Sequence, residues 1–205
     1  MNDSRVLRRA GPHAVVRNFL GEELVARLLE YAEVSEGLFT QASAGVGGAK
    51  RVDPGVRVSR RLSDCGPLTE EIKARLLARV PALIATLGLV PFQPAGADIE
   101  LVAHGDGAFY KRHLDVSIGS GAPADSRVLS TVYYFYRMPK PFSGGALRLH
   151  PFVGRDHTAC VDVEPERDLL VAFPASAPHE VLPVRCPSNR FMDSRFAVNG
   201  WIRRA

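Results

Sequence analysis

The chain has 205 residues, of which 46% are hydrophobic and 23% are charged, as in an ordinary globular domain. Its net charge of +4 comes from basic residues scattered along the sequence, so we expect no nucleic-acid partner. Three widely spaced cysteines argue against a disulfide framework and a cysteine zinc site, and the lack of a long apolar segment predicts a cytoplasmic protein with no membrane partner.

The first half of the chain is predicted to hold two helices. In residues 21–34, apolar side chains recur at helical spacing, and we expect that face to pack against a sheet. A longer helical pattern runs from Ile72 to Leu87 and ends at Gly88, with Pro81 inside it as an expected kink or break.

A glycine-rich segment, residues 41–54, lies between the two predicted helices and is followed by the more extended residues 56–60. The segment offers little apolar area to bury. It is therefore predicted to be a substrate lid.

From residue 98 onward the pattern changes to short runs rich in Val, Leu, Phe and Tyr, separated by turn residues. These runs predict eight strands, at residues 99–103, 109–114, 128–136, 146–150, 158–163, 168–173, 179–184 and 196–202. The sequence thus indicates an α+β protein that is mostly β, built as a jelly roll or barrel.

The predicted elements divide the chain into a helical support and lid, residues 1–97, and a β core, residues 98–205. Two helices of this size cannot bury their apolar faces alone. We therefore expect the two parts to form one cooperative unit. The sequence leaves the oligomeric state open.

The residues most indicative of chemistry are His113 and Asp115. They stand two positions apart in a predicted strand, where alternate side chains share one face, so both can reach one metal ion. A second histidine from a remote strand would complete a set of two imidazoles and one carboxylate, which leaves three coordination positions open. Such a set is typical of iron(II) oxygenases, whereas structural zinc sites are closed by four ligands.

Three histidines are candidates for the remote ligand: His150, His157 and His179. His179 is favoured because it follows a turn-rich segment and begins a predicted strand, which places it near the mouth of a sheet. His150 precedes a proline and His157 stands in a predicted loop, so we expect both to be surface or turn residues.

Five segments, taken in order, resemble the prolyl-hydroxylase-like branch of the 2-oxoglutarate- and iron(II)-dependent dioxygenases: residues 104–115, 131–134, 144–148, 179–181 and 195–201. The resemblance covers roughly the C-terminal half of the chain, and residues 56–59 and 18–20 add weaker matches. It implies a double-stranded β-helix, with Fe(II), 2-oxoglutarate and O2 as cofactor and cosubstrates. Members of the family are often kept active by ascorbate.

Carried over residue by residue, the resemblance implies that His113, Asp115 and His179 are the iron ligands and that Arg195 binds the distal carboxylate of 2-oxoglutarate. Tyr134 matches a tyrosine that often donates a hydrogen bond to that carboxylate, and Tyr110 matches one beside the metal pocket. The alternatives are that both tyrosines only pack and that Arg195 is an exposed residue on a strand edge.

The chain departs from the family pattern at two places. His104 stands where a tyrosine is common, and its alternative role is that of a plain loop histidine. The interval before Arg195 is longer than usual, which makes Arg185 and Arg190 rival anchors, although a strand position among packing neighbours favours Arg195. The candidate substrate-pocket residues are His104, Arg57, Arg148 and Trp201.

The resemblance implies hydroxylation of a C–H bond with release of succinate and CO2, most naturally on a peptide or protein residue. Basic residues from Lys50 to Arg61 could clamp an extended or acidic chain, and residues 116–127 are expected to form another wall. Two alternatives stay open: hydroxylation of a free amino acid or small metabolite, and a jelly-roll module that binds a metal or a sugar without turnover.

Overall fold

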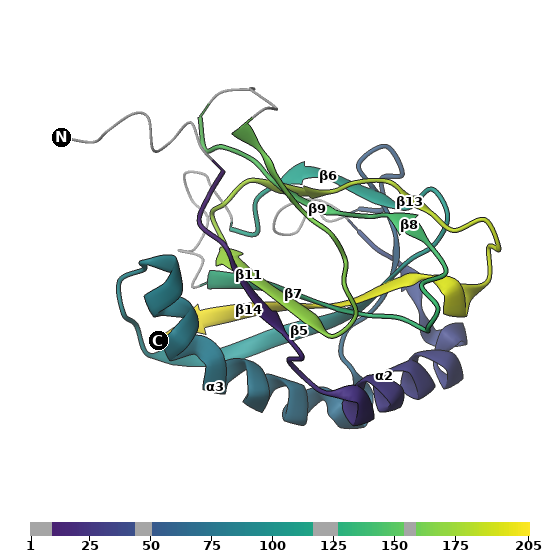
Figure 1. The fold of residues 1–205 in the computed structure, drawn as a ribbon, viewed down its shortest axis with the longest axis horizontal. Coiled ribbons are helices and arrows are strands. Elements are labelled where there is room, and N and C mark those ends of the chain that lie inside the picture. The colour runs from purple at the N-terminus through teal and green to yellow at the C-terminus, as the bar shows by residue number, and fades with distance from the viewer. Residues whose placement is uncertain (1–9, 44–50, 117–126, 154–158) are drawn as a thin grey trace.

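The computed structural model describes residues 10–43, 51–116, 127–153 and 159–205. In this part of the chain, two sheets face one another and two helices lie on the outer side of the larger sheet (Figure 1). The large sheet has seven strands in the order β1-β11-β7-β14-β5-β4-β2, and the small sheet has five in the order β10-β9-β12-β6-β3. This architecture confirms the predicted mostly β jelly roll with supporting helices.

The elements that build the large sheet come from the whole described chain. Their bounds are β1 Ala14–Arg17, β2 Thr40–Gln41, β4 Arg60–Leu62, β5 Pro94–His104, β7 Arg127–Phe135, β11 Leu169–Pro174 and β14 Arg195–Arg204. The small sheet contains β3 Arg57–Val58, β6 Phe109–His113, β9 Leu147–Leu149, β10 Val161–Val163 and β12 His179–Val181. A separate two-stranded sheet pairs β8 Ser143–Gly144 with β13 Val184–Arg185.

Two α-helices and three short 3-10 helices complete the described elements. Their bounds are α2 Glu22–Val34, α3 Thr69–Leu87, η1 Glu36–Leu38, η3 Gly66–Leu68 and η5 Phe191–Asp193. Among the described residues, no helix is both long enough and apolar enough to cross a membrane. Both predicted α-helices are confirmed, and α3 continues through the exposed Pro81, so the proline does not break the helix.

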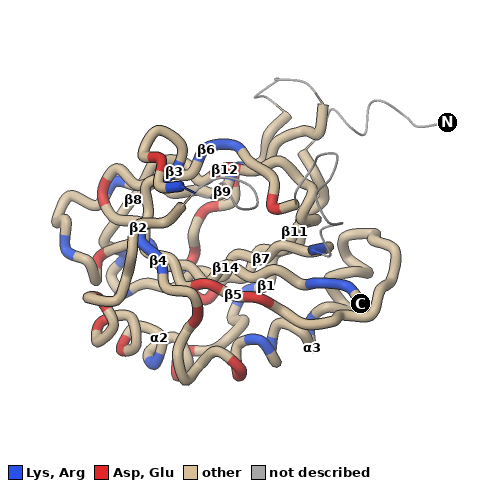
Figure 2. Tube along the Cα trace, turned by 180° about the vertical axis from the view of Figure 1, so that it is seen from behind, with Lys and Arg blue, Asp and Glu red and all other residues tan. Residues whose placement is uncertain are grey.

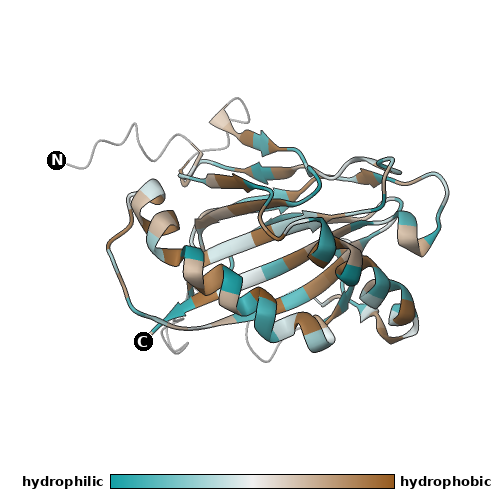
Figure 3. Ribbon diagram, turned by 60° about the horizontal axis from the view of Figure 1, so that its bottom comes forward, coloured by the Kyte–Doolittle hydropathy of each residue, from teal (hydrophilic) through white to brown (hydrophobic). Residues whose placement is uncertain are grey.

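The main hydrophobic core lies between the helices and the large sheet. Buried residues of α2 and α3, such as Leu28, Leu76 and Val80, join one cluster with Leu101 of β5 and Phe196 of β14. Figure 3 shows both helices lying across one face of the large sheet. The helices and the β core therefore share apolar surface, as expected for elements that cannot be stable alone.

A second hydrophobic cluster lies between the two sheets, on the face of the large sheet opposite the helices. It includes Val132 and Tyr134 of β7, Leu147 and Leu149 of β9, and Phe173 of β11. Side chains of one strand alternate between the two faces of its sheet. Strand β7 accordingly contributes Tyr133 to the helical side and Tyr134 to the interior of the jelly roll.

The predicted strand boundaries were wrong in several places. The run 179–184 is divided into β12 and β13, which belong to different sheets, and the edge strand β1 was not predicted because only four residues form it.

Charged residues of both signs are interspersed along the described chain (Figure 2). The three cysteines are free thiols, with Cys65 and Cys186 buried and Cys160 partly exposed, as expected.

The side chain of Asp168 connects the residues just before α2 to strand β7 of the large sheet. Its buried carboxylate accepts hydrogen bonds from the backbone N–H groups of Leu20 and Gly21, at 2.8 and 2.9 Å, and from the hydroxyl of Tyr133, at 2.9 Å. The backbone of Asp168 has a φ of 58°, a conformation that aspartate tolerates better than alanine. One side chain thus satisfies two buried donors and one partly buried donor.

We expect the Asp168→Ala substitution to lower the free energy of unfolding by about 3 kcal/mol, because it leaves two buried donors and one partly buried donor without their acceptor. Urea denaturation followed by circular dichroism measures this change. The matched control is Asp162→Ala, which removes a partly exposed carboxylate paired with Arg148 and should cost less than about 1 kcal/mol. Equal losses in the two variants would contradict the role assigned to Asp168.

Candidate metal centre and cosubstrate pocket

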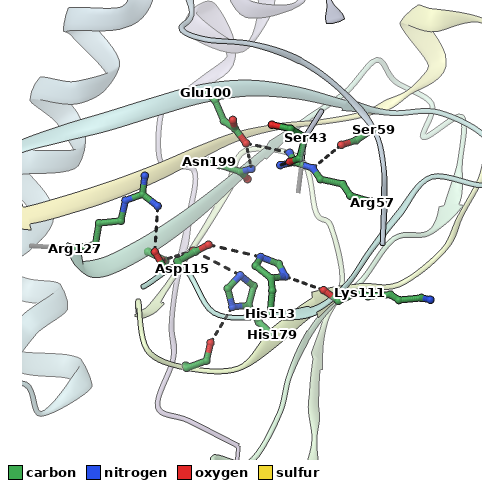
Figure 4. A network of polar contacts seen from close by, with 12 residues as sticks. Ser43, Arg57, Ser59, Glu100, Lys111, His113, Asp115, Arg127, His179 and Asn199 are labelled. Carbon is green, nitrogen blue, oxygen red and sulfur yellow. Dashed lines mark hydrogen bonds and ion pairs between the residues drawn. The ribbon is translucent and has the colours of Figure 1, made fainter. Parts of the chain in front are cut away.

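His113, Asp115 and His179 meet at one end of the small sheet. His113 is the last residue of β6 and His179 is the first residue of β12, and the two are directly opposed in the antiparallel pair. Nε2 of His113 lies 3.7 Å from Oδ1 of Asp115, and Nε2 of His179 lies 3.6 Å from Oδ2 (Figure 4). One donor atom from each residue falls within 4.8 Å of the others, so the three can hold one metal ion.

The position of Asp115 differs from the prediction. We expected His113 and Asp115 to share one face of a strand, but β6 ends at His113 and Asp115 lies in the bend that follows. The Asp115 N–H donates to the carbonyl of Ala175, at 3.1 Å, in the turn that precedes His179. A turn-to-turn contact, and not strand alternation, therefore brings the carboxylate to the two imidazoles.

Backbone carbonyls orient both imidazoles. Nδ1 of His113 lies 2.8 Å from the carbonyl oxygen of Lys111, and Nδ1 of His179 lies 2.9 Å from that of Ala177. In each ring, Nδ1 carries the proton that this bond requires, which leaves the Nε2 lone pair directed toward Asp115. Such contacts commonly fix the tautomer of metal-binding histidines.

The environment also favours the ionisation states that a metal ion needs. Burial, together with the neighbouring His179 ring, lowers the pKa of His113, which keeps its imidazole neutral. Burial is the largest single influence on the pKa of the Asp115 carboxyl and acts to raise it, but the two histidines and the hydrogen bond from Ser130 together outweigh burial and lower the pKa. A neutral imidazole and an ionised carboxylate are the forms that bind metals.

Ser130 supports the carboxylate from β7. Its hydroxyl donates a 2.6 Å hydrogen bond to Oδ2 of Asp115, and the serine is almost fully buried. Sequence reasoning missed this residue, because a serine inside a strand carries no motif. Its only signal is that Ser130 and Thr131 are two small hydroxyl residues within an apolar and aromatic run.

We expect the Ser130→Ala substitution to weaken Fe(II) binding roughly tenfold, because residues that orient a metal ligand typically contribute that much. An anaerobic Fe(II) titration measures the dissociation constant. The control is Ser143→Ala in β8, where the serine is exposed and belongs to the separate two-stranded sheet. An unchanged Fe(II) affinity in Ser130→Ala would show that Asp115 is held without the hydroxyl.

Arg195 is the largest fully buried side chain among the described residues, and it carries unsatisfied hydrogen-bond donors. Nη1 donates to Nδ1 of His104 at 3.2 Å, while Nε and Nη2 have no partner within the described structure. The guanidinium lies over the ring of Tyr134, 4.7 Å from its centroid, and the buried Tyr134 hydroxyl is also without a partner there. Burial lowers the pKa of Arg195 and raises that of Tyr134.

Unsatisfied buried donors are costly, so this group of atoms is suited to an anionic ligand that the chain itself does not supply. A carboxylate has the planar geometry and the charge that match the free Nε and Nη2 edge. The rival anchors are wrong: Arg185 is exposed, and Arg190 is bound to Asp193 at the surface. The residues present therefore fit a cosubstrate carboxylate at Arg195.

The three candidate ligands and Arg195 line one cavity of about 530 Å³. Four further residues that were proposed from the sequence line it too: Tyr110, His104, Arg57 and Trp201. Glu100, which was not proposed, also lines the cavity. Tyr110 stacks on His113 with ring centroids 3.6 Å apart. The cavity thus joins a metal site, an anion anchor and additional polar walls.

Arg57 belongs to a buried polar network at the side of this cavity (Figure 4). Its guanidinium donates to Ser59 and Glu100, at 2.9 and 3.1 Å, and lies 4.7 Å from the centroid of the Tyr110 ring. Asn199 also donates to Glu100, at 3.1 Å. The sequence indicated Arg57 but not Glu100 or Asn199, because polar residues in strands reveal their partners only after the strands pair.

Three expectations need correction. Arg148 does not line the cavity: Leu147 and Leu149 point into the core, so Arg148 faces the opposite side of β9 and pairs with Asp162 at 2.7 Å. His104 is not a loop residue but the buried end of β5. His150 is buried and contacts Glu180 at 3.1 Å, so it is not a surface residue.

Several expected features fall on parts of the chain that the structure does not describe. These are His157, Lys50, half of the predicted lid at residues 41–54 and most of the predicted wall at residues 116–127. Within the described part of the lid, the carbonyl of Ser43 accepts a hydrogen bond from Arg57 at 3.4 Å. The lid and the wall stay predictions.

Comparisons with known proteins agree with this geometry. An uncharacterised PKHD-type hydroxylase of Synechocystis sp. is 32% identical over 199 residues, which make up 95% of this chain and 64% of the relative. The chain thus spans less than two thirds of that relative's length. A family model described as the 2OG-Fe(II) oxygenase superfamily matches residues 99–203, the region that contains the three ligands and Arg195.

Solved structures with the same fold include two prolyl hydroxylases. A prolyl-4-hydroxylase of Pseudomonas putida has a TM-score of 0.66 at 25% identity, covering 95% of this chain and 94% of that one. A prolyl hydroxylase of Trichoplax adhaerens, in complex with a peptide fragment of hypoxia inducible factor, has a TM-score of 0.65 at 22% identity, covering 95% and 84%. From the family match over half of its length, the chain belongs to the 2OG-Fe(II) oxygenase superfamily.

Proposed function

We propose that this protein is a 2-oxoglutarate- and Fe(II)-dependent dioxygenase that hydroxylates a C–H bond of a peptide or protein residue. The observation that carries the proposal is the meeting, in one cavity, of a two-histidine, one-carboxylate set with a buried arginine whose Nε and Nη2 lack partners among the described residues. Either feature alone has other uses. Together they match the requirements of a metal ion and a dicarboxylate cosubstrate.

The bound cofactors would supply the oxidation: Fe(II) and 2-oxoglutarate react with O2 to hydroxylate the substrate, with release of succinate and CO2. The protein would supply binding and orientation. His113, Asp115 and His179 would occupy one side of the metal, and Arg195 would hold the carboxylate at the far end of the cosubstrate. The apolar residues between the sheets would keep bulk water from the cosubstrate site.

A peptide or protein substrate is proposed for two reasons. The relatives reported above are named hydroxylases or prolyl hydroxylases, and one of them is in complex with a peptide. In addition, the cavity has a polar side wall, formed by Arg57, Arg61 and Asn199, that offers hydrogen-bond partners for a peptide backbone. The alternative substrate is a free amino acid or a small metabolite, which a cavity of about 530 Å³ can also hold.

The test uses the purified protein with Fe(II) and 2-oxoglutarate. Without oxygen, the weak visible charge-transfer band of the chelate should appear; with oxygen, succinate should be released. Release stimulated by proline-containing peptides, but not by free amino acids, would support the peptide substrate, and the reverse would support the alternative. Iron binding without the band would favour a jelly-roll binding module. Two expectations stay predictions: that ascorbate keeps the enzyme active, and that the protein is cytoplasmic.

A further inference from the structure

His104 and Arg195 form a cross-strand pair at the base of the cavity. They are directly opposed in the antiparallel pair of β5 and β14, so their side chains lie on the same face of the large sheet. Nη1 of Arg195 lies 3.2 Å from Nδ1 of His104, and both residues line the cavity. His104 is 3% exposed and Arg195 is 0% exposed, so bulk water does not screen the contact.

The hydrogen bond defines the state of the imidazole. A guanidinium has only donors, so Nδ1 of His104 must be the acceptor, and the ring is the neutral tautomer with its proton on Nε2. Burial, with the nearby charges of Arg195 and Arg57, holds the pKa of His104 well below its ordinary value. His104 therefore acts as a fixed acceptor toward Arg195 and adds no second positive charge.

The same contact decides which edge of the guanidinium remains available. Because Nη1 is occupied by His104, the donors left without a described partner are on Nε and Nη2. Gly145, with a φ of 72°, lies close to the stem: a Cβ there would be 2.7 Å from Cδ of Arg195 and 3.1 Å from Nε. The stem is thus held close to Gly145, its end is fixed by the imidazole, and the side-on edge is the part of the guanidinium without a described partner.

We propose that His104 is a positioning residue, which holds Arg195 so that its Nε and Nη2 edge receives the distal carboxylate of the cosubstrate. The inference rests on the proposed function and adds to it the residue that sets selectivity for a dicarboxylate. A hydrogen-bond acceptor at the Nδ1 position is the feature required of His104. The aromatic ring itself is not required.

Two substitutions separate these features. In His104→Asn, the side-chain oxygen can take the place of Nδ1 and accept from Arg195; in His104→Leu, the acceptor is lost while the size is similar. Each protein, loaded with Fe(II) without oxygen, is titrated with 2-oxoglutarate and with 2-oxopentanoate, which lacks the distal carboxylate. The absorbance band of the chelate gives both dissociation constants.

We expect His104→Leu to weaken 2-oxoglutarate binding roughly ten- to a hundredfold, the usual effect of losing a buried hydrogen bond to a charged group. Binding of 2-oxopentanoate and of Fe(II) should stay within about twofold, since neither ligand uses Arg195. His104→Asn should bind 2-oxoglutarate nearly as the unmodified protein does. Thermal unfolding of the metal-free proteins shows whether each variant is folded.

Three results would overturn the inference. In the first, His104→Leu keeps the full preference for 2-oxoglutarate. In the second, it weakens both keto acids equally, as general damage to the site would. In the third, His104→Asn is folded but binds 2-oxoglutarate as weakly as His104→Leu does. If the unmodified protein shows no preference for 2-oxoglutarate over 2-oxopentanoate, the proposed cosubstrate role of Arg195 fails, and this result is distinguishable from the other three.

Discussion

The His179→Ala substitution is expected to reduce Fe(II) affinity by at least about a hundredfold and to abolish succinate release, because one of only three protein ligands is lost. His113 and Asp115 would remain near one another, but two donors cannot hold the ion in a fixed orientation. The single tryptophan of the chain, Trp201, lines the cavity, so quenching of its fluorescence by Fe(II) provides a direct binding measurement.

The matched control is His13→Ala, which removes a partly exposed histidine just before β1 and should leave Fe(II) affinity unchanged. A second readout is thermal unfolding, because a metal ion that binds only the folded state raises the melting temperature. Fe(II) should raise the melting temperature of the unmodified protein and of His13→Ala but not that of His179→Ala. Tight Fe(II) binding by His179→Ala would mean that the three residues are not the metal site.

The second large effect is expected at Arg195, where binding and stability should change in opposite directions. Arg195→Leu removes a buried guanidinium whose Nε and Nη2 have no partner among the described residues, so the metal-free protein should gain about 1–3 kcal/mol in its free energy of unfolding. The same substitution removes two charge-assisted donors for the cosubstrate. Its affinity for 2-oxoglutarate should fall by roughly a hundredfold or more.

Urea denaturation of the metal-free protein and anaerobic titration with 2-oxoglutarate measure the two changes separately. Arg185→Leu is the control, because Arg185 is an exposed arginine in β13 and should affect neither quantity. Gains in stability with loss of binding are common where a site holds unsatisfied polar groups for a ligand. If Arg195→Leu is instead strongly destabilised, Arg195 has a structural partner in addition to His104, and its role as the anchor would be in doubt.

The sequence by itself predicted the parts of the protein that depend on local pattern. The spacing of Leu and Val residues predicted α2 and α3, and the turn before His179 placed that histidine at the start of a strand. Such features depend on interactions between neighbours in the chain, which a single sequence displays directly. Local motifs, together with the family resemblance that they carry, therefore named the three candidate ligands and Arg195.

Only the tertiary structure decided how these residues are supported. His104 meets Arg195, and Ser130 meets Asp115, because particular strands pair in a particular register, and register depends on contacts between distant segments. The same reason explains the error at Arg148, whose side chain faces Asp162 and not the cavity. Local sequence thus indicates which residues are the candidate metal ligands. The orientation of these ligands, the geometry of Arg195 and the shape of the pocket depend on long-range packing, which single-sequence patterns do not encode.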